Sequence, residues 1–336
     1  FYVNQTEKVD NLMSYFKMPV VFEVHFKDGS FSSRKEWLSH AADTVYVHAP
    51  GGKEIDYTLF DPGSNLIKTV DFHKSYEELA AQAENATHMI DRSDALGELR
   101  DSALEKKKDL LIHIFNKGNY YTIQNEVLLQ LSKDTSEAAI EIFRKALHSK
   151  DHLVRRGAVN NLPDSVTEIP AVILPDVEAL LHDSSYYTIE ITLRKLCKDN
   201  PSKNAGNKYL SETKSFYGLS NNVRISWLEI SYGATSDSAE QKKFADELVN
   251  FTSNRYEFRT RVHAMNALES MMYCNVDLIK NLFNACTYTN NHISNPASKC
   301  LKTLIAKPEN LQLAKSVFAS GNWKDWEKKI IEPQLK

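Results

Sequence analysis

A pattern of apolar residues recurs at intervals of about 34 residues through the chain and limits the folds open to it. In each copy a residue able to cap a helix is followed by an apolar anchor, and further apolar residues lie four and then seven or eight positions after the anchor. This spacing marks one face of an α-helix. The anchors are Ile123, Val154, Ile189, Val223 and Phe258, at intervals of 31, 35, 34 and 35 residues.

Between consecutive copies lies a second helical pattern, such as Glu137–Leu147 or Gln241–Phe251. Two helices per period are typical of an α-solenoid. Arg155 and Arg224 directly follow their anchors, which resembles HEAT-type helices. We therefore expect a HEAT-like α-α superhelix of antiparallel helix pairs, with the anchored helices in one layer and their anchors buried. The five copies span Asn119–Leu131, Asp151–Leu162, Ser185–Cys197, Ser220–Ser231 and Asn254–Asn266.

The first 72 residues have a different, strand-like pattern. Val20–Phe26 begins with a short apolar run and then alternates, and Asp28-Gly29 follows as a hairpin turn. Short strands in this number predict a small antiparallel β-sandwich. The other expected strands are Phe1–Val3, Val45–Val47, Ile55–Phe60 and Leu66–Phe72.

Helical patterns begin after residue 73, where Ser75 and Glu78 have the spacing of a capping box. Glycine and proline are scarce, with 11 and 10 residues, which favours helices over turn-rich folds. We predict two domains, a β-sandwich domain over 1–72 and a HEAT-like helical domain over 73–336. The overall class is mostly α.

Composition excludes several classes of function. The net charge of −3 argues against a basic nucleic-acid-binding protein. No apolar run approaches the roughly 20 residues of a membrane span. The four cysteines are isolated in the sequence, and we expect them to be small buried side chains. The chain starts at Phe1 inside an apparent strand, so we expect a piece of a longer protein, and its cellular compartment stays open.

No known catalytic or metal-binding motif appears. The HExxH zinc helix, the nucleophile elbow and the glycine-rich phosphate loops are all missing from the sequence. His148 and His152 are four residues apart across a loop, and two ligands without a third seldom hold zinc. The run Lys106–Lys108 reads as a solvated helix face. We expect no catalytic residue, no metal ligand and no cofactor site in this chain.

Several segments resemble zinc aminopeptidases of the aminopeptidase N family. Phe1–Thr6 and Phe16–Val24 resemble the strand, Gln-Thr, loop and Met-Pro stretch of that family's small β-sandwich. Phe60–Val70 looks like the last hairpin of the same sandwich. Tyr76–Leu79 and Ile90–Leu96 are similar to the opening of the helical domain that follows it.

The resemblance implies that this chain is the non-catalytic C-terminal region of such an enzyme. Zinc and the catalytic residues would then belong to a missing upstream domain, and the helical domain would cap the active site and shape its peptide-binding cavity. Its partners would be the missing N-terminal and catalytic domains and peptide substrates, with no nucleic acid. Two alternatives remain open: a non-catalytic aminopeptidase-like relative that serves as a protein-binding scaffold, and an independent HEAT adaptor.

Aromatic and basic residues at the starts of the repeated helices are candidates for peptide contacts. Amphipathic aromatics with arginine suit a surface that binds varied peptides and attracts a carboxylate. Arg255 and Arg259 are four residues apart, which is one turn of a helix, so both can face the same side. Packing between repeats is the competing explanation for the tyrosines. The candidates are Arg255, Arg259, Tyr186, Tyr187, Tyr120 and Tyr121.

Overall fold

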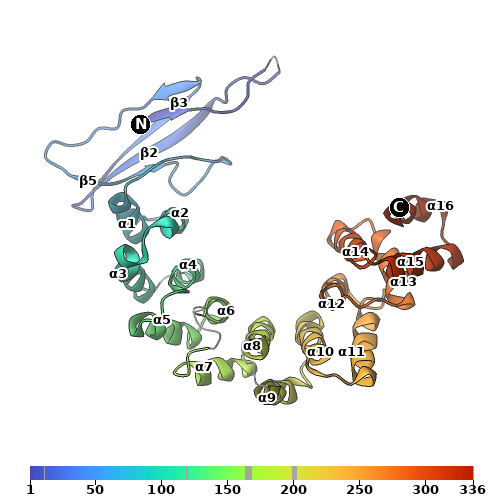
Figure 1. The fold of residues 1–336 in the computed structure, drawn as a ribbon. Coiled ribbons are helices and arrows are strands. Elements are labelled where there is room, and N and C mark those ends of the chain that lie inside the picture. Colours follow the sequence, from blue (N-terminus) through green and yellow to red (C-terminus); the bar gives the residue numbers. More distant parts are fainter. Residues whose placement is uncertain (11, 119, 163–168, 199–202, 336) are drawn as a thin grey trace. The chain divides into compact units, whose positions relative to one another are not determined.

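The computed structural model describes residues 1–10, 12–118, 120–162, 169–198 and 203–335. Two small antiparallel sheets come first, followed by helices (Figure 1). One sheet pairs β1 with β4, and the other has the order β3-β2-β5. The strands are β1 (Tyr2–Asn4), β2 (Met18–Phe26), β3 (Phe31–Leu38), β4 (Ala42–Thr44) and β5 (Ile55–Phe60).

Strand β2 is the centre of the larger sheet and shows the alternation that the sequence predicts. Val20, Phe22, Val24 and Phe26 are buried, because every second side chain of a strand faces the same side. The turn at Asp28-Gly29 is confirmed, with Gly29 at a φ of 82°. The strands at Ile55–Phe60 and at the N-terminus are also confirmed.

Three details of the strand prediction were wrong. Strand β4 ends at Thr44, just before the expected Val45–Val47, and β3 was not expected. Leu66–Phe72 is not a strand. An extended segment becomes a strand only when its main chain pairs with a neighbour, and residues 67–72 have no main-chain hydrogen bond to the described chain.

A polar joint connects the strands to the first helices. Asp61 is buried and accepts a hydrogen bond from Lys68 Nζ at 2.5 Å and one from Leu66 N–H at 2.9 Å. The carboxylate of Asp91 accepts the N–H of Gly63 at 3.0 and 3.1 Å. Residues far apart in the sequence therefore fix the end of β5 against the second helix.

From Tyr76 onward, the regular structure of the described chain is helical. The predicted capping box is confirmed: Ser75 and Glu78 cap the first helix reciprocally. The helices are α1 (Tyr76–Asn85), α2 (Met89–Glu98), α3 (Leu104–Asn116), α4 (Tyr121–Leu131), α5 (Glu137–Leu147), α6 (His152–Asn160), α7 (Leu174–Ala179), α8 (Tyr186–Lys198), α9 (Lys203–Thr213), α10 (Asn222–Ala234), α11 (Ser238–Phe251), α12 (Phe258–Ser270), α13 (Val276–Cys286), α14 (Asn291–Leu304), α15 (Pro308–Ser320) and α16 (Asp325–Ile331), with short 3₁₀ turns at Leu99–Asp101, Leu180–His182, Leu219–Asn221 and Glu332–Leu335.

The described chain divides into two compact units. Residues 1–146 and 161–162 form the first, and the described parts of 147–160 and 169–335 form the second. These units group residues by packing, so the domain boundary at 72/73 stays a prediction. Within the second unit α6, α8, α10, α12 and α14 pack one on the next (Figure 1). Helix α11 packs against α10 and α12, and α13 packs against α14. The fold is thus a mostly helical HEAT-like repeat region preceded by small antiparallel sheets.

Four of the five anchors are buried as predicted, and the fifth shows an error of register. Ile123, Val154, Ile189 and Val223 have lost nearly all contact with solvent. Phe258 is only half-buried, because it is the first residue of α12 and lies at the N-terminal end of the helix. The buried residue at the equivalent depth, third in the helix like Val154 in α6, is Thr260.

Asn119, which the sequence suggests as the cap of the first copy, lies outside the described residues. Among the helices that the structure does describe, none combines the length and the apolar character that crossing a bilayer requires.

Candidate functional site

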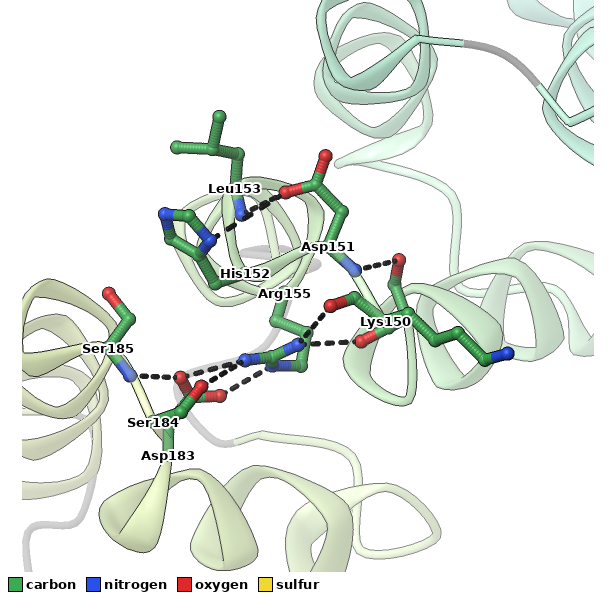
Figure 2. Close-up of polar contacts among 9 residues, drawn as sticks. Lys150, Asp151, His152, Leu153, Arg155, Asp183, Ser184 and Ser185 are labelled. Atoms are coloured by element: carbon green, nitrogen blue, oxygen red, sulfur yellow. Dashed lines mark hydrogen bonds and ion pairs between the residues drawn. The ribbon is translucent and has the colours of Figure 1, made fainter.

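Arg155 on α6 connects the turn before its own helix to the turn before α8. Its Nε and Nη2 donate to the two carboxylate oxygens of Asp183 at 2.5 and 2.9 Å (Figure 2). Its Nη1 donates to the main-chain carbonyls of Ser149 and Lys150 at 2.7 and 3.1 Å. One guanidinium therefore binds a carboxylate in the turn before α8 and two carbonyls in the turn before α6.

This contact is largely removed from water. The side chains of Arg155 and Asp183 are 13% and 2% exposed. The hydrogen bond to Asp183 raises the pKa of Arg155, and a bidentate charge-assisted pair fixes the geometry as well as the charge. Asp183 also accepts the N–H of Ser185 at 2.7 Å, at the start of α8. Arg155 therefore ties one repeat to the next through Asp183.

Arg224 on α10 makes the same kind of contact two repeats later. Its Nε and Nη2 each donate to Glu247 at 2.7 Å, and its Nη1 donates to the carbonyl of Lys214 at 3.0 Å. The guanidinium lies 4.5 Å from the ring centre of Trp227. Arg155 and Arg224 are therefore parts of the framework of the fold.

Three further basic side chains bind the end of a preceding helix in this way. Each is the fourth residue of its helix, as Arg155 is in α6. A helix leaves its last carbonyls without intrahelical partners, and a cation stabilises that end. The contacts run from Arg92 to Ala83, from Lys107 to Leu99 and Arg100, and from Arg261 to Thr252, at 2.7–3.0 Å.

This pattern corrects one expectation from the sequence. Lys107 is buried and does not belong to a solvated face. The arginine of α12 that corresponds to Arg155 is Arg261, the fourth residue of its helix. Counting from the first residue of each helix, rather than from an apolar anchor, is the signal that finds it.

Arg255 and Arg259 do not share a helical turn. Arg255 lies in the turn before α12, whereas Arg259 is the second residue of that helix. Both are exposed, and the Arg259 guanidinium lies 4.7 Å from the ring centre of Phe258. The argument from helical spacing was wrong for this pair, and their role in peptide contact stays a prediction.

The candidate tyrosines stand at helix starts as expected. Tyr120 and Tyr121 contact each other, with ring centres 4.3 Å apart. Tyr186 is about half exposed, and Tyr187 lies 5.9 Å from the Arg156 guanidinium. Among the contacts of the described residues, none joins Tyr186 or Tyr187 to Arg255 or Arg259. Of the six candidates, the structure therefore shows contact between Tyr120 and Tyr121.

A polar pocket that the sequence analysis missed lies on α8, α10 and α12. Its volume is about 270 Å³. Residues at one-turn spacings on these three helices form its wall, and only the packing of the helices brings them together. The lining residues are Glu190, Arg194, Asn222, Ile225, Glu229, His263, Asn266 and Ala267.

Two carboxylates share one guanidinium in this pocket. Arg194 Nη1 lies 2.8 Å from Glu229, and its Nε lies 3.5 Å from Glu190. Glu190 also accepts hydrogen bonds from Asn222 Nδ2 at 2.6 Å and Ser226 Oγ at 3.0 Å. The pocket therefore has preformed acceptors and an excess of one negative charge when histidine is neutral.

The described residues hold no group of three or more His, Cys, Asp or Glu side chains placed to bind a metal. His148 pairs with Asp176 at 3.0 Å, and His152 lies 3.9 Å from Asp151. Burial raises the pKa of Cys197 and Cys274 to about 11 and that of Cys300 to about 12, so these thiols are poor nucleophiles.

Comparisons with known proteins find similar solved structures but no matching protein family. No family model and no curated protein matches the chain. Among solved structures, the CpcE and CpcF complex of phycocyanin lyase from Nostoc sp. PCC7120 is 14% identical over 80% of this chain and 97% of that one, with a TM-score of 0.44. A Kap121p mutant is 13% identical over 76% of this chain and 32% of that one, with a TM-score of 0.43.

Human deoxyhypusine hydroxylase in complex with glycerol is 12% identical over 77% of this chain and 94% of that one, with a TM-score of 0.34. At these values no argument about function rests on the likeness, and the fold follows from the helix packing described above. None of these three is an aminopeptidase, so they give no support to the resemblance to the aminopeptidase N family.

Proposed function

We propose that this chain is a protein-binding scaffold whose polar pocket on α8, α10 and α12 receives a basic side chain of a partner polypeptide. The observation that carries the proposal is the pocket itself, in which Glu190 and Glu229 share the single cation Arg194. Repeat folds that stack helices commonly present such a surface to another chain.

The chemistry of the pocket favours a lysine or arginine side chain. Both carboxylates have hydrogen-bond partners already, so they are held in place before a ligand arrives, which lowers the entropy lost on binding. An incoming cation brings the local charge to zero. His263 Nδ1 is buried without a hydrogen-bond partner in the described chain, and a bound group would give it one.

Selection from a displayed library of random twelve-residue peptides tests this proposal. We expect the full chain to enrich peptides with a lysine or arginine, and Glu229→Gln to weaken the best of them about tenfold. Glu141→Gln, the same change on α5 outside the pocket, is the matched control and should leave the affinity unchanged. Failure to enrich basic peptides, or equal binding by Glu229→Gln, would contradict the proposal.

A second candidate is the non-catalytic C-terminal region of a zinc aminopeptidase of the aminopeptidase N family. A specific observation favours it: two segments that carry the resemblance, Phe60–Val70 and Ile90–Leu96, meet where the Asp91 carboxylate accepts the N–H of Gly63. Here the helical region would cap a zinc site in an upstream domain, and the pocket would contact peptide substrates.

Sequencing the gene upstream of Phe1 tests the second candidate. An HExxH motif with a downstream glutamate in the same reading frame is the expected result, because those side chains bind catalytic zinc and position its water. A reading frame without that motif would leave the scaffold as the only supported function.

A further inference from the structure

Strand β1 has one edge without a partner in the described chain. Phe1 N and O both bond to Val45, and Gln5 N–H donates to Ala41 O at 2.9 Å. Main-chain groups of alternate residues in an antiparallel strand point to opposite edges. Tyr2 and Asn4 therefore direct their N–H and C=O groups away from β4, and the two-stranded sheet ends there.

The segment that follows β5 has unpaired main-chain groups as well. Residues 67–72 form neither helix nor strand, and their main chain makes no hydrogen bond with the described residues. The rings of Phe72 and Phe1 lie 6.1 Å apart between centres. The segment therefore runs beside the N-terminal stretch without pairing to it.

A groove of about 540 Å³ is lined by both stretches. Phe16, Met18 and Phe60 add apolar surface, and polar lining comes from residues such as Asn4, Glu7 and Asp71. Tyr2 and Ile67 are 86% and 109% exposed, and Phe16 and Val70 are each about half exposed. A cluster of large exposed apolar side chains around one groove marks an interaction site more often than scattered ones do.

We propose that this groove binds an extended strand of a partner polypeptide with apolar side chains at alternate positions and basic residues at its ends. A strand supplies main-chain donors and acceptors to unpaired edges, as in β-strand addition. A helix uses its main-chain groups internally and is 10–12 Å wide. The strand therefore fits better.

The charges that line the groove determine which charged residues suit the ends of the partner strand. Lys68 is neutralised by Asp61 at 2.5 Å, whereas Asp71 is exposed and among the described residues its nearest basic group is the His73 ring, 3.4 Å away. Glu7 lines the groove and is exposed. Two carboxylates thus remain to attract lysine or arginine. This surface lies within the first unit, so the inference does not depend on the pocket of the second.

The probe is a fluorescein-labelled peptide of alternating valine and threonine with lysine at both ends, titrated into the full chain. We expect a saturable rise in anisotropy and slower hydrogen exchange in Phe1–Glu7 and residues 66–72. The same peptide with alternate amides N-methylated cannot donate along one edge and should bind at least about tenfold more weakly.

Ile67→Asp should also weaken binding about tenfold, and the fold should survive because Ile67 is exposed. Val276→Asp is the matched control: it replaces another exposed apolar residue, at the first position of α13, where a carboxylate is tolerated. Absence of saturable binding, equal binding of the N-methylated peptide, unchanged affinity of Ile67→Asp, or protection at the outer edge of β3 instead would each overturn the inference. Self-association that protects the same amides would overturn it in favour of a second copy.

Discussion

Replacing Arg155 with methionine tests whether the basic side chains hold successive helices together. The change removes two hydrogen bonds to Asp183, two to the carbonyls of Ser149 and Lys150, and one to Ser184 Oγ. Within the described chain, the Asp183 carboxylate, which is 2% exposed, then keeps only the hydrogen bond from Ser185 N–H. Removing one partner of a buried ion pair costs about 3–5 kcal/mol. We therefore expect Arg155→Met to lower the free energy of unfolding by about that amount, measured by urea denaturation.

Arg156→Met is the control for this prediction. It changes the next residue of the same helix, where the guanidinium lies 5.9 Å from the Tyr187 ring, and should cost no more than about 1 kcal/mol. In a double-mutant cycle, Arg155→Met and Asp183→Asn should couple by more than about 1 kcal/mol. Equal losses for Arg155→Met and Arg156→Met, or additive effects in the cycle, would refute the reasoning.

Three further predictions concern the buried anchor Val223, the buried cysteine thiols and the metal content of the chain. Val223→Ala should cost about 1–3 kcal/mol in urea denaturation because it leaves a cavity at a fully buried site; a loss below about 0.5 kcal/mol would contradict it. With thiol pKa values of about 11 to 12 for Cys197, Cys274 and Cys300, iodoacetamide at pH 8 should label these thiols about 100-fold more slowly in the native chain than in urea. Elemental analysis should find no stoichiometric zinc in this chain alone, and one tightly bound zinc per chain would show that a site was overlooked.

Much of the helical region could be predicted from the sequence because helical periodicity is local. The patterns of Glu137–Leu147 and of the helices anchored by Ile123, Val154, Ile189 and Val223 need only the spacing of apolar residues. The fifth copy failed because Phe258 has the chemistry of an anchor but stands at the start of its helix. Apolar character alone does not fix where a helix begins.

The polar pocket and the unpaired groove could not be predicted because they depend on which segments meet. Glu190 and Glu229 are ordinary helix-surface residues until α8 packs on α10 and Arg194 joins them. Leu66–Phe72 has the composition of a strand, yet a strand requires a neighbour, and no local pattern states which neighbour is present.

Photo-crosslinking from the pocket tests the scaffold function most directly. A benzoylphenylalanine placed at Asn266, an exposed residue of the pocket lining, should crosslink to the basic peptide selected by the full chain. The same group at Lys280, exposed on α13, is the control. We predict a crosslink from position 266 that excess unlabelled peptide abolishes and that Glu229→Gln reduces. Equal crosslinking from positions 266 and 280, or none from 266 under saturating peptide, would contradict the claim that this pocket binds the partner.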